Sequence, residues 1–227
     1  MKKILLITLV ISLIICGFAI FAKSQITNLM SDPSQYENAI VGLTHPDVFS
    51  NEADYLAQLS ADLDKSDIII KGIFTGNRVS LFQTTLSQIH IVEVIKGDTA
   101  LLDKMIAVYE TNYFVPYQYH VYYQNHDCTN ITIESKSYFF FLKRNNSIIY
   151  RKWGLSEYAF NNAEIKHYIY PTELQENDIA VLSAIDIADK KIPFSSISQY
   201  AYVVSSTEAA KQVQIVHEYV MDYLIAN

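Results

Sequence analysis

The sequence of 227 residues is poor in glycine and in charge, and each scarcity excludes a class of protein. Its 6 glycines are too few for the glycine-rich loops that hold nucleotide phosphates or for low-complexity linkers. Charged residues make up 18% and hydrophobic residues 50%, a balance that argues against long disordered stretches. The length leaves room for one or two folded domains.

Cysteine is also scarce, and the two cysteines do not indicate a disulfide framework. Cys16 lies inside an apolar N-terminal run. If that run sits in a membrane or is removed, Cys128 has no intrachain partner to pair with. We therefore expect the rest of the chain to be stabilised by its hydrophobic core.

Basic residues are too few for nucleic acid to be a partner. Three of the 17, Lys2, Lys3 and Lys23, lie in the first 23 residues, which hold no acidic residue, so the remainder carries 14 basic against 24 acidic residues. Such a surface repels phosphate backbones, and no basic stripe interleaved with aromatic residues is present.

What the chain does have is an uncharged run over residues 4–22, directly after two lysines. As a helix this run would span about 28 Å, close to the ~30 Å hydrocarbon core of a bilayer. The lysines predict that the N-terminal end lies in the cytoplasm. We therefore expect a single-pass protein of the cell membrane with its bulk outside the cell or, alternatively, a secreted protein.

Three fates of this run stay open. It can be retained as an anchor. It can be cleaved as a signal peptide after Ala22, although Ile20 at the −3 position is larger than the usual small residue. Cys16 can also carry a lipid, because residues 13–16 resemble a bacterial lipobox, with Ile15 where a small residue is wanted.

Three later segments are predicted to be helical. Apolar residues at helical spacing predict a helix over residues 51–64 with Ser50 as its N-cap. A second helix is expected over residues 171–193. A third follows a capping box formed by Ser205 and Glu208. Its apolar stripe consists of Ala209, Val213, Val216, Val220 and Tyr223.

β-branched and aromatic runs predict a sheet in the middle of the chain. Gly72 lies inside the first of these runs, residues 68–74, and marks a bulge or bend. Residues 76–77 mark a turn, and residues 97–98 mark the end of the second run, residues 79–96. The end of the second run does not alternate, so we expect one face in a barrel and the other under a helix. The expected strands are residues 68–74, 79–96, 102–110, 135–144, 146–153 and 199–204. An extra ribbon is expected from residues 121–123 and 131–133.

The order of these strands resembles that of secreted Gram-positive bacterial domains with an OB-like barrel, which are similar in pattern to the netrin-like domains of metalloproteinase inhibitors. The matching positions are Asp67, Gly72, Val92, Ile95, Lys96, Gly97, Asp98, Tyr138, Phe139 and Phe141. The resemblance covers residues 66–143 and implies a five-stranded Greek-key barrel. The inhibitors place an N-terminal cysteine amine over a zinc ion; this chain lacks that cysteine, so no inhibitory residue carries over.

The expected fold class is therefore α+β, with a small five-stranded OB-like β-barrel, flanking helices and an N-terminal transmembrane or signal helix. Residues 1–23 form the signal or anchor and residues 24–65 a stalk with an amphipathic helix. Residues 66–152 form the barrel, and residues 153–227 a helical extension that packs on it.

No local catalytic signature is present: there is no G-x-S-x-G, H-E-x-x-H, phosphate-binding loop or C-x-x-C. His120, His126, Asp127 and Cys128 lie close together, but their spacing matches no zinc knuckle. An envelope hydrolase that uses His126 and Cys128 is one alternative function. An immunity or inhibitor protein for a secreted toxin or protease is another. No cofactor or metal is expected.

The most suggestive feature is a group of tyrosines. Tyrosine gives a large contact area at low entropic cost and packs on proteins or stacks on sugars. We therefore expect a non-enzymatic binding module outside the cytoplasm, with an envelope protein or a glycan as its partner. The candidate binding residues are Tyr113, Tyr117, Tyr119, Tyr122 and Tyr123.

Overall fold

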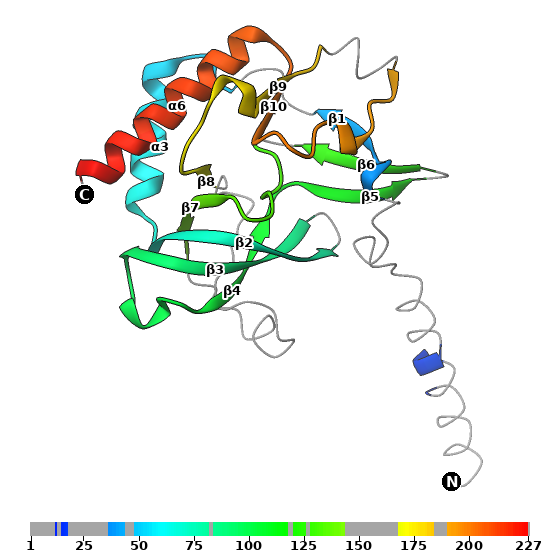
Figure 1. Cartoon of the computed structure of the whole chain (residues 1–227), viewed down its shortest axis with the longest axis horizontal. Helices are drawn as coiled ribbons and strands as arrows, with labels where there is room; N and C mark the ends of the chain where they lie inside the picture. Colours follow the sequence, from blue (N-terminus) through cyan, green and yellow to red (C-terminus); the bar gives the residue numbers. More distant parts are fainter. Residues whose placement is uncertain are drawn as a thin grey trace, which may run out of the picture.

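The computed structural model describes residues 12, 15–17, 36–43, 48–81, 84–117, 120–125, 128–143, 168–183 and 190–226, which form a mixed α+β fold dominated by sheets (Figure 1). The strands are β1 (Ile40–Leu43), β2 (Ile68–Leu81), β3 (Thr84–Lys96), β4 (Met105–Glu110), β5 (Tyr113–Tyr117), β6 (His120–Asn125), β7 (Ser137–Leu142), β8 (Tyr168–Pro171), β9 (Ile179–Val181) and β10 (Tyr202–Val204). The helices are α3 (Glu52–Asp64) and α6 (Thr207–Ala226), with the 3-10 turns η2 (Thr99–Leu101), η3 (Glu176–Asp178) and η4 (Phe194–Ser196).

Five antiparallel strands form the larger sheet, in the order β4-β3-β2-β7-β8. The first core cluster, which includes Ile70, Ile89 and Phe140, is built from side chains of these five strands alone. The sheet curls around that cluster, yet it is not closed. The predicted OB-like barrel is wrong in this respect, because β4 and β8 are not paired with each other among the described residues. The expected strand at 146–153 lies outside them.

The predicted strand over residues 79–96 is wrong, because the chain reverses within it. β2 runs on to Leu81 and pairs with β3 from Thr84 onward. The expected turn at residues 76–77 is instead a bulge in β2, where the register shifts between Phe74 and Arg78. Gly76 has a φ of 87°, in the left-handed region that favours glycine. The expected bend at Gly72 is confirmed by a second register shift beside it.

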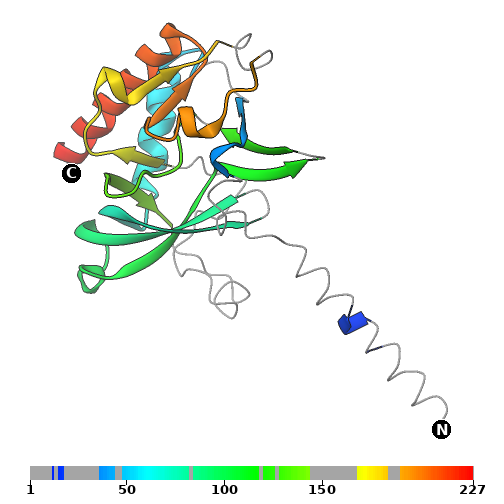
Figure 2. The same cartoon turned by 45° about the vertical axis from the view of Figure 1, so that its right-hand side comes forward.

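Helices cover the other face of the larger sheet, as expected for a strand such as β3 whose last residues do not alternate. Leu59 and Leu63 of α3 and Val216 of α6 pack against outward-facing sheet residues such as Phe141. Figure 2 shows both helices on this side of the sheet. The larger sheet is thus buried between a core and a helical layer.

Both helices match their predicted ranges, but their N-caps are shifted by one residue. Asn51, not Ser50, caps α3: its side-chain oxygen accepts from the backbone N–H groups of Ala53 (3.1 Å) and Asp54 (3.4 Å). Ser206 caps α6 by accepting from the Ala209 N–H at 3.0 Å. The N-cap of α6 is therefore Ser206 and not the expected Ser205. The predicted stripe is buried at Ala209, Val213, Val216 and Val220.

A second sheet has the order β1-β6-β5, with β1 parallel and β5 antiparallel to β6. The ribbon expected from residues 121–123 and 131–133 is wrong, because residues 121–123 belong to β6, which pairs with β1 and β5. Residues 131–133 are not a strand, and their backbone N–H groups bond side chains instead. The N–H of Ile131 donates to the Tyr123 hydroxyl (3.2 Å) and that of Ile133 to the Tyr138 hydroxyl (2.9 Å).

The helix predicted over residues 171–193 is wrong. Within the described part of this segment, β8 ends at Pro171, η3 follows, and β9 pairs in parallel with β10. The three-residue strand β9 lies against β10, and its residues Ile179 and Ala180 are buried there. The strand expected over residues 199–204 is confirmed for its last three residues, which form β10. Of the predicted anchor, residues 12 and 15–17 are described and are helical. The helices of the described residues include none that is long and apolar enough to cross a membrane.

Candidate functional site

The predicted binding residues lie on the β5–β6 hairpin and divide between the two faces of its sheet. Tyr123 stands in register with Phe114 and Val41 on the inner face, and all three are buried. Its hydroxyl donates to Asn130 Oδ1 at 2.5 Å. Tyr123 is therefore a core residue and not part of a binding surface. Tyr119 lies outside the described residues.

The outer face of the same sheet carries the other predicted tyrosines. Alternation along β5 places Tyr113 and Tyr117 on this face, and the register places Tyr122 there too, opposite Val115 and Ile40. Tyr117 is 62% exposed. We call Ile40, Tyr113, Val115, Tyr117, His120 and Tyr122 the tyrosine face.

Two ring contacts organise this face. The rings of Tyr117 and Tyr122 meet edge to face with centroids 6.3 Å apart. The His120 ring meets Tyr122 in the same way, also at 6.3 Å. Edge-to-face pairs of this kind hold aromatic side chains in place without covering them. The result is an ordered and partly exposed aromatic surface.

The thiol considered as a nucleophile lies in the core. Cys128 is 3% exposed and packs with Ile179, Tyr202 and Val213. A thiol buried in this way is not open to a substrate in solution. His126 and Asp127 lie outside the described residues. In the described part of the chain, no three His, Cys, Asp or Glu side chains are grouped so that they could hold a metal ion.

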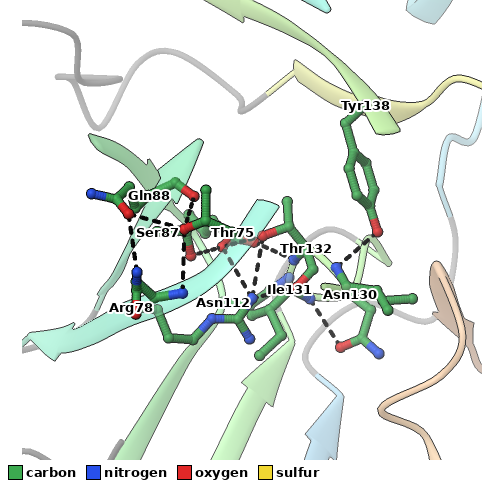
Figure 3. A network of polar contacts seen from close by, with 12 residues as sticks. Thr75, Arg78, Ser87, Gln88, Asn112, Asn130, Ile131, Thr132 and Tyr138 are labelled. Atoms are coloured by element: carbon green, nitrogen blue, oxygen red, sulfur yellow. Dashed lines mark hydrogen bonds and ion pairs between the residues drawn. The ribbon is translucent and has the colours of Figure 1, made fainter. Parts of the chain in front are cut away.

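Sequence reasoning missed a buried polar network centred on Glu110, the last residue of β4. Figure 3 labels Arg78, Ser87 and Thr132, which belong to this network. Glu110 is 2% exposed, and its carboxylate accepts three hydrogen bonds. The donors are the Ser87 hydroxyl, the Thr132 N–H at 2.6 Å and the Thr132 hydroxyl at 2.9 Å. These bonds compensate for the burial of the carboxylate.

Arg78 is the cation of this network. Its Nη2 donates to the carbonyl and hydroxyl oxygens of Thr132 and lies 3.9 Å from Glu110 Oε1. Its guanidinium carbon lies 4.0 Å from the centre of the Phe74 ring. Burial lowers the pKa of Arg78 and the charge of Glu110 acts in the opposite direction, but an arginine stays protonated. The Nε group is buried and has no hydrogen-bond partner among the residues that the structure describes.

A cavity of about 320 Å³ lies beside this guanidinium. Arg78 and Thr132 form its polar side, and Phe74, Ile131 and Phe194 are among its apolar lining residues. Phe74 belongs to the core of the larger sheet, whereas Ile131 and Phe194 belong to the core under the smaller sheet. The cavity thus lies at the seam between the two sheets.

Two carboxylates complete the cavity lining. Glu37 and Glu134 line it, and both are exposed. The Glu134 carboxylate lies over Gly76, since a Cβ at that glycine would come within 2.8 Å of Glu134 Oε1. The cavity is therefore acidic where it meets solvent and basic at its buried side.

Comparison with family models found no match to this chain, and comparison with the curated proteins found none either. The tyrosine face and the cavity are therefore the two candidate sites of this chain.

Proposed function

We propose that this chain is a non-enzymatic binding module held outside the bacterial cytoplasm and that its tyrosine face binds a protein of the cell envelope. The observation that carries the proposal is the alignment of Tyr113, Tyr117 and Tyr122 on the outer face of the smaller sheet. Tyrosine is enriched in protein interfaces because it combines apolar area with a polar hydroxyl.

The geometry favours a protein over a glycan. A sugar ring stacks on a flat, open aromatic face, whereas Tyr117 and Tyr122 meet edge to face. Val115 and Ile40 lie in the same register row as Tyr122 and add apolar area between the tyrosines. A mixed aromatic and aliphatic surface with a polar rim is the usual composition of the centre of a protein interface.

The proposed location outside the cytoplasm is inferred from the sequence. An uncharged run over residues 4–22 after two lysines suits a membrane segment with the bulk outside. The resemblance to secreted bacterial domains supports the same side of the membrane. The run acts as an anchor, a cleaved signal or the site of lipidation at Cys16, and each of these delivers the tyrosine face to the envelope.

The test is a pull-down of cross-linked envelope proteins with the full-length chain and with a variant carrying Tyr117→Ala and Tyr122→Ala. We expect the variant to fold normally, as judged by circular dichroism, and to lose a protein that the unaltered chain captures. Met105→Ala is a matched control, because Met105 is an exposed apolar strand residue of the larger sheet.

Two results would contradict the proposal. One is capture of the same proteins by the folded double variant and by the unaltered chain. The other is binding to purified cell-wall glycan with no protein captured, which would make the partner a sugar.

A further inference from the structure

We propose that the cavity at the seam of the two sheets binds a small zwitterion, a molecule that carries a carboxylate and an ammonium group as a free amino acid or a dipeptide does. This site is separate from the tyrosine face. The tyrosine face lies on the outer side of the smaller sheet, whereas Phe194, which lines the cavity, packs on the inner side against Phe114 and Tyr123.

Arg78 provides the position for the carboxylate. A guanidinium has five N–H donors, and the hydrogen bonds of Arg78 all leave from Nη2, toward Thr132. Glu110 is occupied by Ser87 and Thr132 and lies at 3.9 Å, beyond hydrogen-bond distance. Nη1 forms no hydrogen bond with a described residue and, unlike Nε, is not fully buried, so it is the donor that a carboxylate in the cavity can reach. A carboxylate is the acceptor that arginine binds best.

Glu134 and Glu37 provide the position for the ammonium group. Both line the cavity at its solvent side, and neither forms an ion pair with another described residue. The Glu134 carboxylate is held close over Gly76. An ammonium group at the partly exposed end of the cavity would be attracted by the charge of both carboxylates.

Other ligand classes satisfy only part of this arrangement. Inorganic phosphate would meet Arg78 but would be repelled by the acidic rim. A simple amine would meet Glu134 but leave the Nη1 group of Arg78 without an acceptor. A zwitterion satisfies both ends at once.

The size and the walls of the cavity narrow the ligand further. About 320 Å³ lies at the lower end of the ~300–1,000 Å³ typical of small-molecule sites, so the ligand is no larger than a dipeptide. Phe74, Ile131 and Phe194 form an apolar wall, which suits an apolar side chain between the two charged groups.

Isothermal titration calorimetry with the full-length chain in mild detergent tests whether the chain binds such a zwitterion. The probes are the standard L-amino acids and L-leucyl-L-leucine at millimolar concentration. We expect at least one of them to bind. Binding by an amino acid alone identifies the free amino acid as the ligand, and binding by L-leucyl-L-leucine alone identifies a dipeptide. If none of the probes binds, the proposal is overturned.

Analogues test the two charged ends. For L-leucine as the probe, N-acetyl-L-leucine lacks the ammonium group and L-leucinamide lacks the carboxylate; for another amino acid, its own N-acetyl and amide forms are used. Each should bind about tenfold more weakly than the zwitterion, since each loses a charge-assisted contact. An N-acetyl form that binds as tightly as its parent overturns the proposal, as does preferential binding of inorganic phosphate.

Variants locate the site. Arg78→Gln should weaken binding about tenfold or more. Because Arg78 is also part of the buried network, the exposed Glu134→Gln provides a second variant that retains the fold, with an expected loss of about threefold. Glu173→Gln removes an exposed carboxylate that does not line the cavity and should leave the affinity unchanged. Unchanged affinity in Glu134→Gln overturns the proposal, whatever the result for Arg78→Gln.

Discussion

The two main sheets of this protein are buried in different ways. The larger sheet encloses a core on one face and lies under α3 and α6 on the other. The smaller sheet has a core on its inner face, with Val41, Phe114 and Tyr123, while Tyr117 on its outer face is 62% exposed. The β5–β6 hairpin extends away from the two helices (Figures 1 and 2).

This difference separates stability from recognition. A sheet that is covered on both faces gains hydrophobic free energy from residues on both sides of its strands. A sheet covered on one face gives up part of that free energy and retains a surface that a partner can bury. Aromatic residues on the open face are the ones expected to gain most from such a partner.

The largest difference between the sheets should appear on truncating one aromatic residue in each. Phe140 of β7 is fully buried in the core of the larger sheet, so Phe140→Ala should lower the free energy of unfolding by about 4 kcal/mol. Tyr117→Ala on the tyrosine face should change it by less than about 0.5 kcal/mol. Urea denaturation of both variants measures this, and equal losses would show that the outer face is packed rather than open.

The next effect concerns the junction between the two sheets. Glu110→Ala removes the acceptor for Ser87 and Thr132 and leaves the buried guanidinium of Arg78 without its counter-charge. We expect a loss of about 3 kcal/mol. Glu93→Ala is the matched control, because Glu93 is an exposed acid on β3. If both substitutions lower the free energy of unfolding by the same small amount, the network does not hold the sheets together.

Elements with a strong local pattern could be predicted from the sequence. The run of residues 137–142 forms β7 and the stripe of Val213, Val216 and Val220 forms the buried side of α6. Both signals lie within one segment, where alternation or helical spacing directly reports burial. The N-caps were misplaced by one residue because Ser50 and Asn51, or Ser205 and Ser206, are equally good caps by residue type.

Features that depend on pairing between distant segments could not be predicted. Whether a curled sheet closes depends on which edge strands meet, and the β-branched character of a strand does not state its partner. Residues 76–77 have the composition of a turn, and only the pairing of Leu81 with Thr84 reveals a bulge.

The candidate sites show the same limit. Alternation alone separates Tyr122 from Tyr123, but it does not say which of them faces the core. Arg78 and Thr132 are 54 positions apart, so no local motif joins them. One hint of the polar network lies on β3, where the buried face changes from the apolar Ile89 to the polar Ser87. In the sequence alone, this change resembles the ordinary solvent-exposed end of a strand.

A smaller effect on the free energy of unfolding concerns α3, one of the helices that cover the larger sheet. Among the described residues, the tyrosine face has no such helical cover. Asn51→Ala removes the acceptor for the N–H groups of Ala53 and Asp54 and should lower the free energy of unfolding by about 1 kcal/mol. Ser50→Ala, one residue earlier, should have little effect. Urea denaturation of the two variants distinguishes the caps, and a larger loss for Ser50→Ala would refute the assignment.

The smallest effect concerns the attachment of α6 to the edge of the larger sheet and depends on pH. The Nε2–H of His217 donates to the Pro171 carbonyl oxygen at 2.9 Å. Burial lowers the pKa of His217 below its ordinary 6.5, although the bond to Pro171 and the charge of Glu218 oppose this. Above pH 6.5 the imidazole is neutral in both the folded and the unfolded chain. As the pH falls through 6.5, the unfolded chain takes up a proton that the folded chain resists, so stability declines.

The comparison of the unaltered chain with His217→Gln isolates this contribution, since glutamine offers an N–H donor and does not titrate. The carboxylates of Asp62 and Asp178 do not interfere. Partial burial acts to raise the pKa of each, but hydrogen bonds from Lys65 and Lys136 outweigh it and hold the pKa below the ordinary 3.8, so their contribution is lost only at lower pH. Free energies of unfolding measured from pH 7 down to about pH 5 should fall more steeply for the unaltered chain than for the variant. Parallel profiles would mean that α6 attaches to β8 through apolar contacts alone.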